Sequence, residues 1–114
     1  MKWSEAEHYC TNLKANLASL PNTETYNFIR EIIFKATGTS PGTWVGGTDA
    51  SKEGYWLWSS GEKFAFINWG PKEPNNLGGL EDCMEINFRG KDYVNDAKCS
   101  LKKPFVCAKR RINH

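Results

Sequence analysis

The chain opens with two apolar patterns that have helical spacing, both before residue 40. The first recurs at intervals of three or four positions and places one set of side chains on a single helical face: Ala6, Tyr9, Cys10, Leu13 and Leu17. Ser4 and Glu7 have the spacing of a capping box, which predicts a helix that begins at Ser4. We expect this apolar face to pack in the core.

The second helical pattern begins at the segment Pro21-Asn22-Thr23-Glu24. Its apolar positions are Phe28, Ile29, Ile32 and Ile33. Gly38 stands where a left-handed residue would end the helix.

After Gly42 the pattern changes to short aromatic or apolar runs bounded by Gly and Ser, which predicts strands. The expected strands are 43–47, 55–58, 83–87, 93–94 and 105–108. Residues 59–82 show no helical or strand period, and an irregular segment of this length in a compact domain is usually functional. Helices first and strands afterwards predict the α+β class.

Composition narrows the possibilities further. The length of 114 residues predicts one domain, 1–114, and 39% hydrophobic with 25% charged residues is typical of a soluble globular chain. Fifteen basic against 13 acidic side chains give no electrostatic case for binding nucleic acid. No apolar stretch approaches the ~20 residues of a membrane span. No leader precedes the first helix, so we expect a mature domain or a fragment, and any oligomer would form through parts not present in this sequence.

Four cysteines indicate the compartment: Cys10, Cys83, Cys99 and Cys107. None forms the closely spaced pair of a zinc or redox motif. Wide, unequal gaps favour two disulfides and an extracellular location, secreted or on a receptor ectodomain. Spacing alone leaves all three possible connectivities open.

The irregular segment and its flanks concentrate oxygen donors. They are Asp49, Glu53, Glu73, Asn75, Asn76, Glu81, Asp82, Asn95 and Asp96. Hard oxygen donors on loops suit Ca²⁺, whereas the histidines, His8 and His114, are remote in sequence. The alternative is that these are solvated loop residues. Acids crowded on a tight loop repel one another unless a cation neutralises them, which favours the calcium interpretation.

A series of short motifs carries a family resemblance. In chain order they are Trp44-Val45-Gly46-Gly47, Glu73-Pro74-Asn75, Glu81-Asp82-Cys83, Val94-Asn95-Asp96, Cys99 and Cys107. Together they resemble a C-type lectin carbohydrate-recognition domain over nearly the whole chain.

This resemblance implies the site residues. A principal calcium site that also binds sugar would use Glu73, Asn75, Glu81, Asn95 and Asp96. A second calcium site would use Asp49, Glu53, Asn76, Glu81 and Asp82. The resemblance also implies the disulfides Cys10–Cys107 and Cys83–Cys99, and a cis peptide bond before Pro74.

The motif Glu73-Pro74-Asn75 implies a sugar class. In the family, Glu-Pro-Asn accompanies mannose-type sugars, including fucose and N-acetylglucosamine, and Gln-Pro-Asp accompanies galactose. The segment Leu77-Gly78-Gly79-Leu80 also lacks the tryptophan that galactose binders stack on the sugar.

The sequence departs from the family pattern in three places. Val94 replaces a tryptophan, and Gly47 stands where the family commonly has leucine. The family's N-terminal strand is missing, so we expect the strand at 105–108 to have an unpaired edge.

Two other functions on this fold stay open: a protein-binding domain and an ice-binding protein. An enzyme is the least favoured class. Two acids such as Glu81 and Asp82 could suggest a glycosidase, but a bound metal would keep both ionised.

Overall fold

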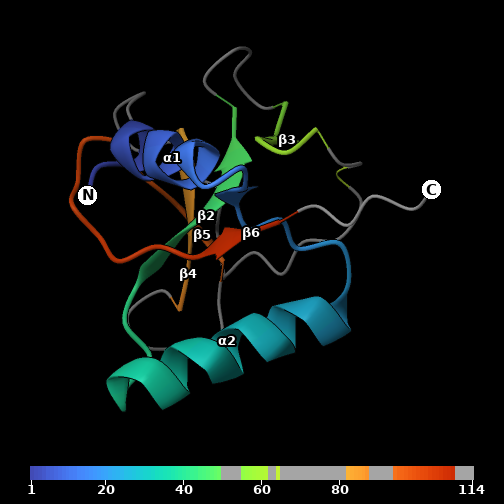
Figure 1. Cartoon of the computed structure of the whole chain (residues 1–114), viewed down its shortest axis with the longest axis vertical. Coiled ribbons are helices and arrows are strands. Elements are labelled where there is room, and N and C mark those ends of the chain that lie inside the picture. The colour runs from blue at the N-terminus through green and yellow to red at the C-terminus, as the bar shows by residue number, and fades with distance from the viewer. Residues whose placement is uncertain (50–54, 62–63, 65–81, 88–93, 110–114) are drawn as a thin grey trace.

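The computed structural model describes residues 1–49, 55–61, 64, 82–87 and 94–109. Its elements are α1 (Trp3–Asn12), β1 (Asn16–Leu17), α2 (Thr23–Thr37), β2 (Thr43–Thr48), β3 (Leu57–Trp58), β4 (Cys83–Ile86), β5 (Asn95–Ala97) and β6 (Cys107–Ala108). Figure 1 shows α1 and α2 on opposite sides of the molecule, with strands between them. The predicted α+β class is confirmed, and β1, between the helices, is an element that the sequence pattern did not predict.

Helix α1 begins one residue before the predicted start, and Ser4 is not its cap. The Lys2 backbone N–H donates to Glu5 Oε1 at 2.9 Å, so Glu5 takes the part that was predicted for Glu7. Trp3 is drawn into the first turn because its backbone N–H donates to Cys99 O at 3.1 Å and its indole Nε1 donates to Val45 O at 2.8 Å. These contacts span the whole sequence, so local pattern did not reveal them.

The predicted apolar face of α1 is only partly buried. Ala6 and Cys10 are inaccessible, but Tyr9 and Leu13 are exposed. The helix ends at Asn12, and Lys14, with a positive φ of 59°, turns the chain back toward β1. Leu17 therefore reaches the core from a strand rather than from the helix.

Helix α2 has both of its predicted ends. The Asn22 side chain caps the first turn by accepting from Thr25 N at 2.8 Å, and Gly38 adopts the left-handed conformation, with φ of 76°. Ile29 and Ile33 are buried with Tyr26, whereas Phe28 and Ile32 are exposed. The helix thus covers the sheet with a narrower stripe than its apolar positions suggest.

The main sheet has the strand order β3-β2-β4-β5, and each pair is antiparallel. Strand β4 lies between β2 and the terminal strand β5, and these three strands carry or adjoin the predicted ligands that the structure describes. The predicted strand at 93–94 is observed two residues later, as Asn95–Ala97, while Val94 forms a bridge beside it. Residue 93 lies outside the described residues. This shift places two predicted ligands inside a strand.

The prediction that the strand at 105–108 has an unpaired edge is wrong. Strand β6 pairs with β1, and the Ala18 N–H donates to Val106 O at 2.8 Å. On the other side, the Trp44 N–H donates to Pro104 O at 2.9 Å. The segment is therefore hydrogen-bonded along both sides by partners that follow α1 and lie in β2.

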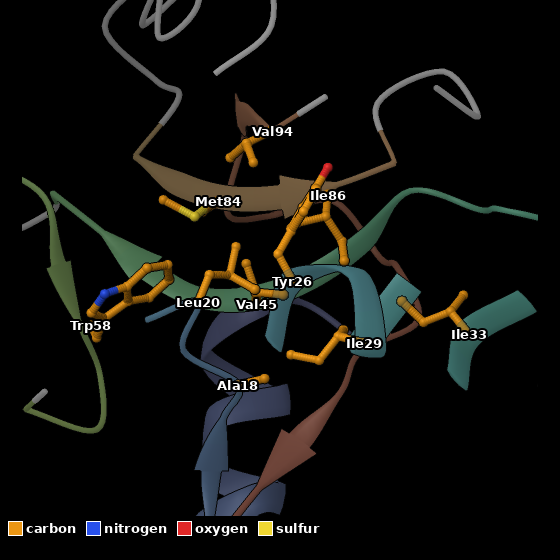
Figure 2. Close-up of a cluster of buried hydrophobic side chains, with 10 residues drawn as sticks. All are labelled: Ala18, Leu20, Tyr26, Ile29, Ile33, Val45, Trp58, Met84, Ile86 and Val94. Carbon is orange, nitrogen blue, oxygen red and sulfur yellow. The ribbon is translucent and has the colours of Figure 1, made fainter. Parts of the chain in front are cut away.

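One buried cluster joins α2 to the main sheet, and Figure 2 shows its side chains converging from both. Val94 is fully buried in this cluster beside Met84 and Ile86, so valine packs where the family resemblance led us to expect tryptophan. The glycine at position 47 is also explained by packing, because a Cβ there would lie 2.4 Å from Met84 Cε. The methionine occupies the space that a side chain at position 47 would need.

Two disulfides cross-link the fold. Cys10 pairs with Cys107 and Cys83 pairs with Cys99, the connectivity that the resemblance implies. The first joins α1 to β6, and the second joins β4 to the segment after β5. Within the described residues, neither helix has the length and apolarity needed to cross a membrane.

Candidate functional site

The described residues contain part of each predicted ligand set. Asn95 and Asp96 represent the principal site, and Asp49 and Asp82 represent the second site. The other predicted ligands lie outside the described residues: Glu53, Glu73, Asn75, Asn76 and Glu81. Their roles, and the peptide bond before Pro74, stay predictions.

Asp49 and Asp82 meet where β2 ends and β4 begins. The Asp49 N–H donates to Asp82 O at 3.1 Å, and Thr48 Oγ1 donates to the same carbonyl at 2.8 Å. Asp49 is only 2% exposed, and Asp82 is half-buried. These backbone contacts bring together the two strand ends that carry the aspartates, and a cation bound there would stabilise both carboxylates.

Asn95 and Asp96 lie on β5, opposite Glu85 and Met84 of β4. They are 5% and 0% exposed. Neighbouring residues of a strand point to opposite faces of the sheet. Because β5 is the last strand of the sheet as described, both residues adjoin the same outer edge. The two predicted ligands of the principal site are therefore adjacent at this edge, on opposite faces of the sheet.

The two pairs of candidate ligands are separated along the sheet. Cys83 is opposite Ala97, which places Asp82 level with Lys98, and Asn95 is three residues further along β5. At ~3.4 Å per residue this offset is about 10 Å. Within the part of the chain that the structure describes, no three His, Cys, Asp or Glu side chains form a metal-binding group. Each pair therefore needs further ligands to complete a metal site. The separation of the two pairs agrees with the prediction of two distinct sites.

The donor chemistry of the described ligands fits Ca²⁺. Every candidate atom is a carboxylate or amide oxygen, and all four cysteines are in disulfides, so no thiolate is available for a softer metal. Asp96, fully buried, is a carboxylate that needs compensation by donors or by a cation.

Glu85 is a buried acid at this site that the sequence analysis did not single out. Its Oε2 accepts from Asn95 Nδ2 at 3.0 Å, and its Oε1 is 3.4 Å from Lys103 Nζ. The available signal was a charged residue between Met84 and Ile86 in an otherwise apolar strand. Its partners could not be found without the register of β4 on β5.

Comparisons of the chain with family models, with known proteins and with solved structures agree with one another. The model of the lectin C-type domain matches residues 1–109. The galactose-specific lectin nattectin of Thalassophryne nattereri is 43% identical over 109 residues, which is 96% of this chain and 68% of that protein. Ladderlectin of Oncorhynchus mykiss is 41% identical over 90% of this chain, which spans 54% of that protein. The herring type II antifreeze protein has a TM-score of 0.88 at 26% identity, over 98% of this chain and 85% of that chain.

Proposed function

The chain belongs to the lectin C-type domain family, and from this premise we propose that it binds carbohydrate through a calcium ion. The observation that carries the proposal is the pair Asn95 and Asp96, buried on the terminal strand of the sheet in a chain that matches the lectin domain. The proposed ligands of the principal ion are Glu73, Asn75, Glu81, Asn95 and Asp96.

The bound ion would supply an electropositive centre for two neighbouring sugar hydroxyls. Each hydroxyl offers a lone pair to the ion, donates its proton to a carboxylate and accepts from an amide NH₂. Glu73 with Asn75, and Glu81 with Asn95, are two such carboxylate and amide pairs. Hydrogen bonds to ionised carboxylates are the stronger kind, so these pairs would select the geometry of the hydroxyls.

A second ion is proposed for the other ligand set: Asp49, Glu53, Asn76, Glu81 and Asp82. Its support is the backbone hydrogen bond between Asp49 and Asp82, which joins the ends of β2 and β4. An ion there would neutralise their repulsion and hold the two strand ends together.

The proposed sugar class is mannose-type, because the chain carries Glu73-Pro74-Asn75. The name of nattectin states galactose specificity for that protein, and the chain shares less than half of its residues. The motif determines which ligand beside the ion is a carboxylate and which is an amide. We therefore give it more weight than the overall sequence identity to nattectin.

A mannose affinity column tests this proposal. We expect calcium-dependent retention, with elution by mannose or fucose and not by galactose. The double substitution Glu73→Gln with Asn75→Asp exchanges the carboxylate and the amide and should reduce retention on mannose. Glu31→Gln is the matched control, because Glu31 lies on the exposed face of α2 and pairs only with Lys35 at 2.9 Å among the described contacts. Preferential elution of the wild type by galactose would contradict the specificity.

Ice binding is a second candidate, favoured by the antifreeze neighbour at 26% identity. Measurable thermal hysteresis, unaffected by mannose, would support this alternative. Protein binding without sugar is the remaining possibility on the same fold, and loss of all glycan binding would favour it.

We also propose an extracellular location and a single domain over residues 1–114. The two disulfides support the location, because such bonds persist in oxidising compartments.

A further inference from the structure

We propose that Glu85 is a positioning residue that sets the orientation of the Asn95 amide and so directs its oxygen toward calcium. The inference rests on the proposed function, since it assumes that Asn95 is a ligand. It concerns a residue outside both predicted ligand sets.

The contact lies in the cross-strand register. Asn95 and Glu85 are direct partners in the antiparallel pair of β5 and β4, so their side chains share one face of the sheet. Asn95 Nδ2 donates to Glu85 Oε2 at 3.0 Å, and each residue is 5% exposed. Little water reaches this hydrogen bond, so losing it would leave a buried polar group unsatisfied.

The chemistry of the two side chains fixes which end of the amide faces Glu85. An ionised carboxylate only accepts hydrogen bonds, whereas an amide has a donating NH₂ and an accepting oxygen. Asn95 must therefore turn its NH₂ toward Glu85, and Oδ1 then points away from it. The second N–H of the amide stays available for a sugar hydroxyl.

Glu85 is itself held in place on its other side. Lys103 Nζ lies 3.4 Å from Glu85 Oε1 and 5.5 Å from the centre of the Trp44 ring. A Cβ at Gly42 would lie 2.6 Å from Oε1, so glycine leaves the space that the carboxylate fills. The cation lies against one oxygen of the carboxylate, which leaves the other for Asn95.

A second glutamate–asparagine pair, Glu7 with Asn16, makes the same kind of hydrogen bond away from the proposed calcium site. Glu7 Oε2 accepts from Asn16 Nδ2 at 2.9 Å, and Glu7 Oε1 accepts from Ser59 Oγ at 2.9 Å. This pair joins α1 to β1 and to the residue after β3. It is a matched control for the structural consequences of changing a partly buried glutamate that holds an asparagine.

The test is calcium titration of the Glu85→Gln variant by calorimetry, with Glu7→Gln beside it. The introduced amide must give its oxygen to Lys103, so its NH₂ faces Asn95 and forces that amide to rotate. We expect the calcium Kd to rise about tenfold for Glu85→Gln, as for other residues that orient metal ligands. Glu7→Gln should leave the Kd within twofold of the wild type.

A rescue separates orientation from general damage. Adding Lys103→Met to Glu85→Gln removes the cation, so the introduced amide can turn its oxygen to Asn95 again. We expect the double variant to recover calcium affinity, although it lacks both charges. A purely structural role for the ion pair predicts the opposite, namely a further loss.

A second readout does not depend on calcium. In the calcium-free protein, the nitrogen-15 resonance of the Asn95 side-chain amide should shift in Glu85→Gln and stay unchanged in Glu7→Gln. A wild type that binds no calcium would refute the proposed function, and this resonance would still judge the orientation by Glu85. An unshifted resonance, or a calcium Kd within twofold of the wild type, would overturn the inference.

Discussion

Gly47 illustrates how one residue in this fold is explained by another far away in sequence. A Cβ there would lie 2.4 Å from Met84 Cε and 3.0 Å from Met84 Cβ. The resemblance identified Gly47 and Val94 as departures from the family pattern. Met84 explains Gly47, and Val94 is buried in the same hydrophobic cluster as Met84. A small residue that makes room for a large one elsewhere in the sequence can be recognised only when the structure shows which residues are in contact.

Gly47→Ala should therefore destabilise the protein by about 1–3 kcal/mol, because the added methyl group overpacks the contact with Met84. Urea denaturation measures the loss. In a Met84→Ala background the same substitution should cost less, since the opposing side chain is gone. Equal costs in the two backgrounds would show that the strain at position 47 lies elsewhere.

Two aspartates distinguish the two proposed ions. Asp96→Asn should abolish sugar binding, because Asp96 belongs to the principal site. Asp49→Asn should remove one calcium from the stoichiometry and retain sugar binding at saturating calcium. Calorimetric stoichiometry and column retention check both outcomes, and loss of sugar binding in Asp49→Asn alone would contradict the assignment.

At the scale of elements, prediction was best where the signal is local. Asn22 and Gly38 mark the ends of α2 because capping depends on neighbouring residues. The start of α1 was misplaced because Trp3 is held by Val45 and Cys99. Strand β1 has two residues, too few to show any alternation, and only its pairing with β6 defines it.

The Cys83–Cys99 disulfide braces β4 against the segment that follows β5, and its sequence separation is 16 residues. Replacing both cysteines by alanine should cost roughly 3 kcal/mol in the chain-entropy model. Because β5 carries Asn95 and Asp96, we also expect weaker calcium binding. Thermal unfolding and calcium titration of the variant check the two effects, and unchanged calcium affinity would show that β5 is positioned without the disulfide.

At the scale of the whole molecule, residue types in the candidate site were easier to predict than their arrangement. The family motifs selected Asn95 and Asp96, and the structure places them on the terminal strand. The role of Glu85 depends on a cross-strand register, which no sequence period encodes. The ligands of 65–81 lie outside the described residues and rest on the motifs alone.

Calcium removal should destabilise the whole domain, because a ligand that binds only the folded state adds to its stability. At a concentration 100 times the Kd this gain is about 2.7 kcal/mol. For a domain of this size, chelation should lower Tm by about 10 °C. Scanning calorimetry with and without chelator measures the shift, and an unchanged Tm would argue against any tightly held ion.

The most direct test of calcium-dependent sugar binding is calorimetric titration of the calcium-stripped protein with mannose, before and after calcium is restored. We predict calcium uptake first, and then mannose binding with a Kd of about 1 mM, which appears only in the presence of calcium. Absence of calcium uptake, or mannose bound equally well in excess chelator, would contradict the account.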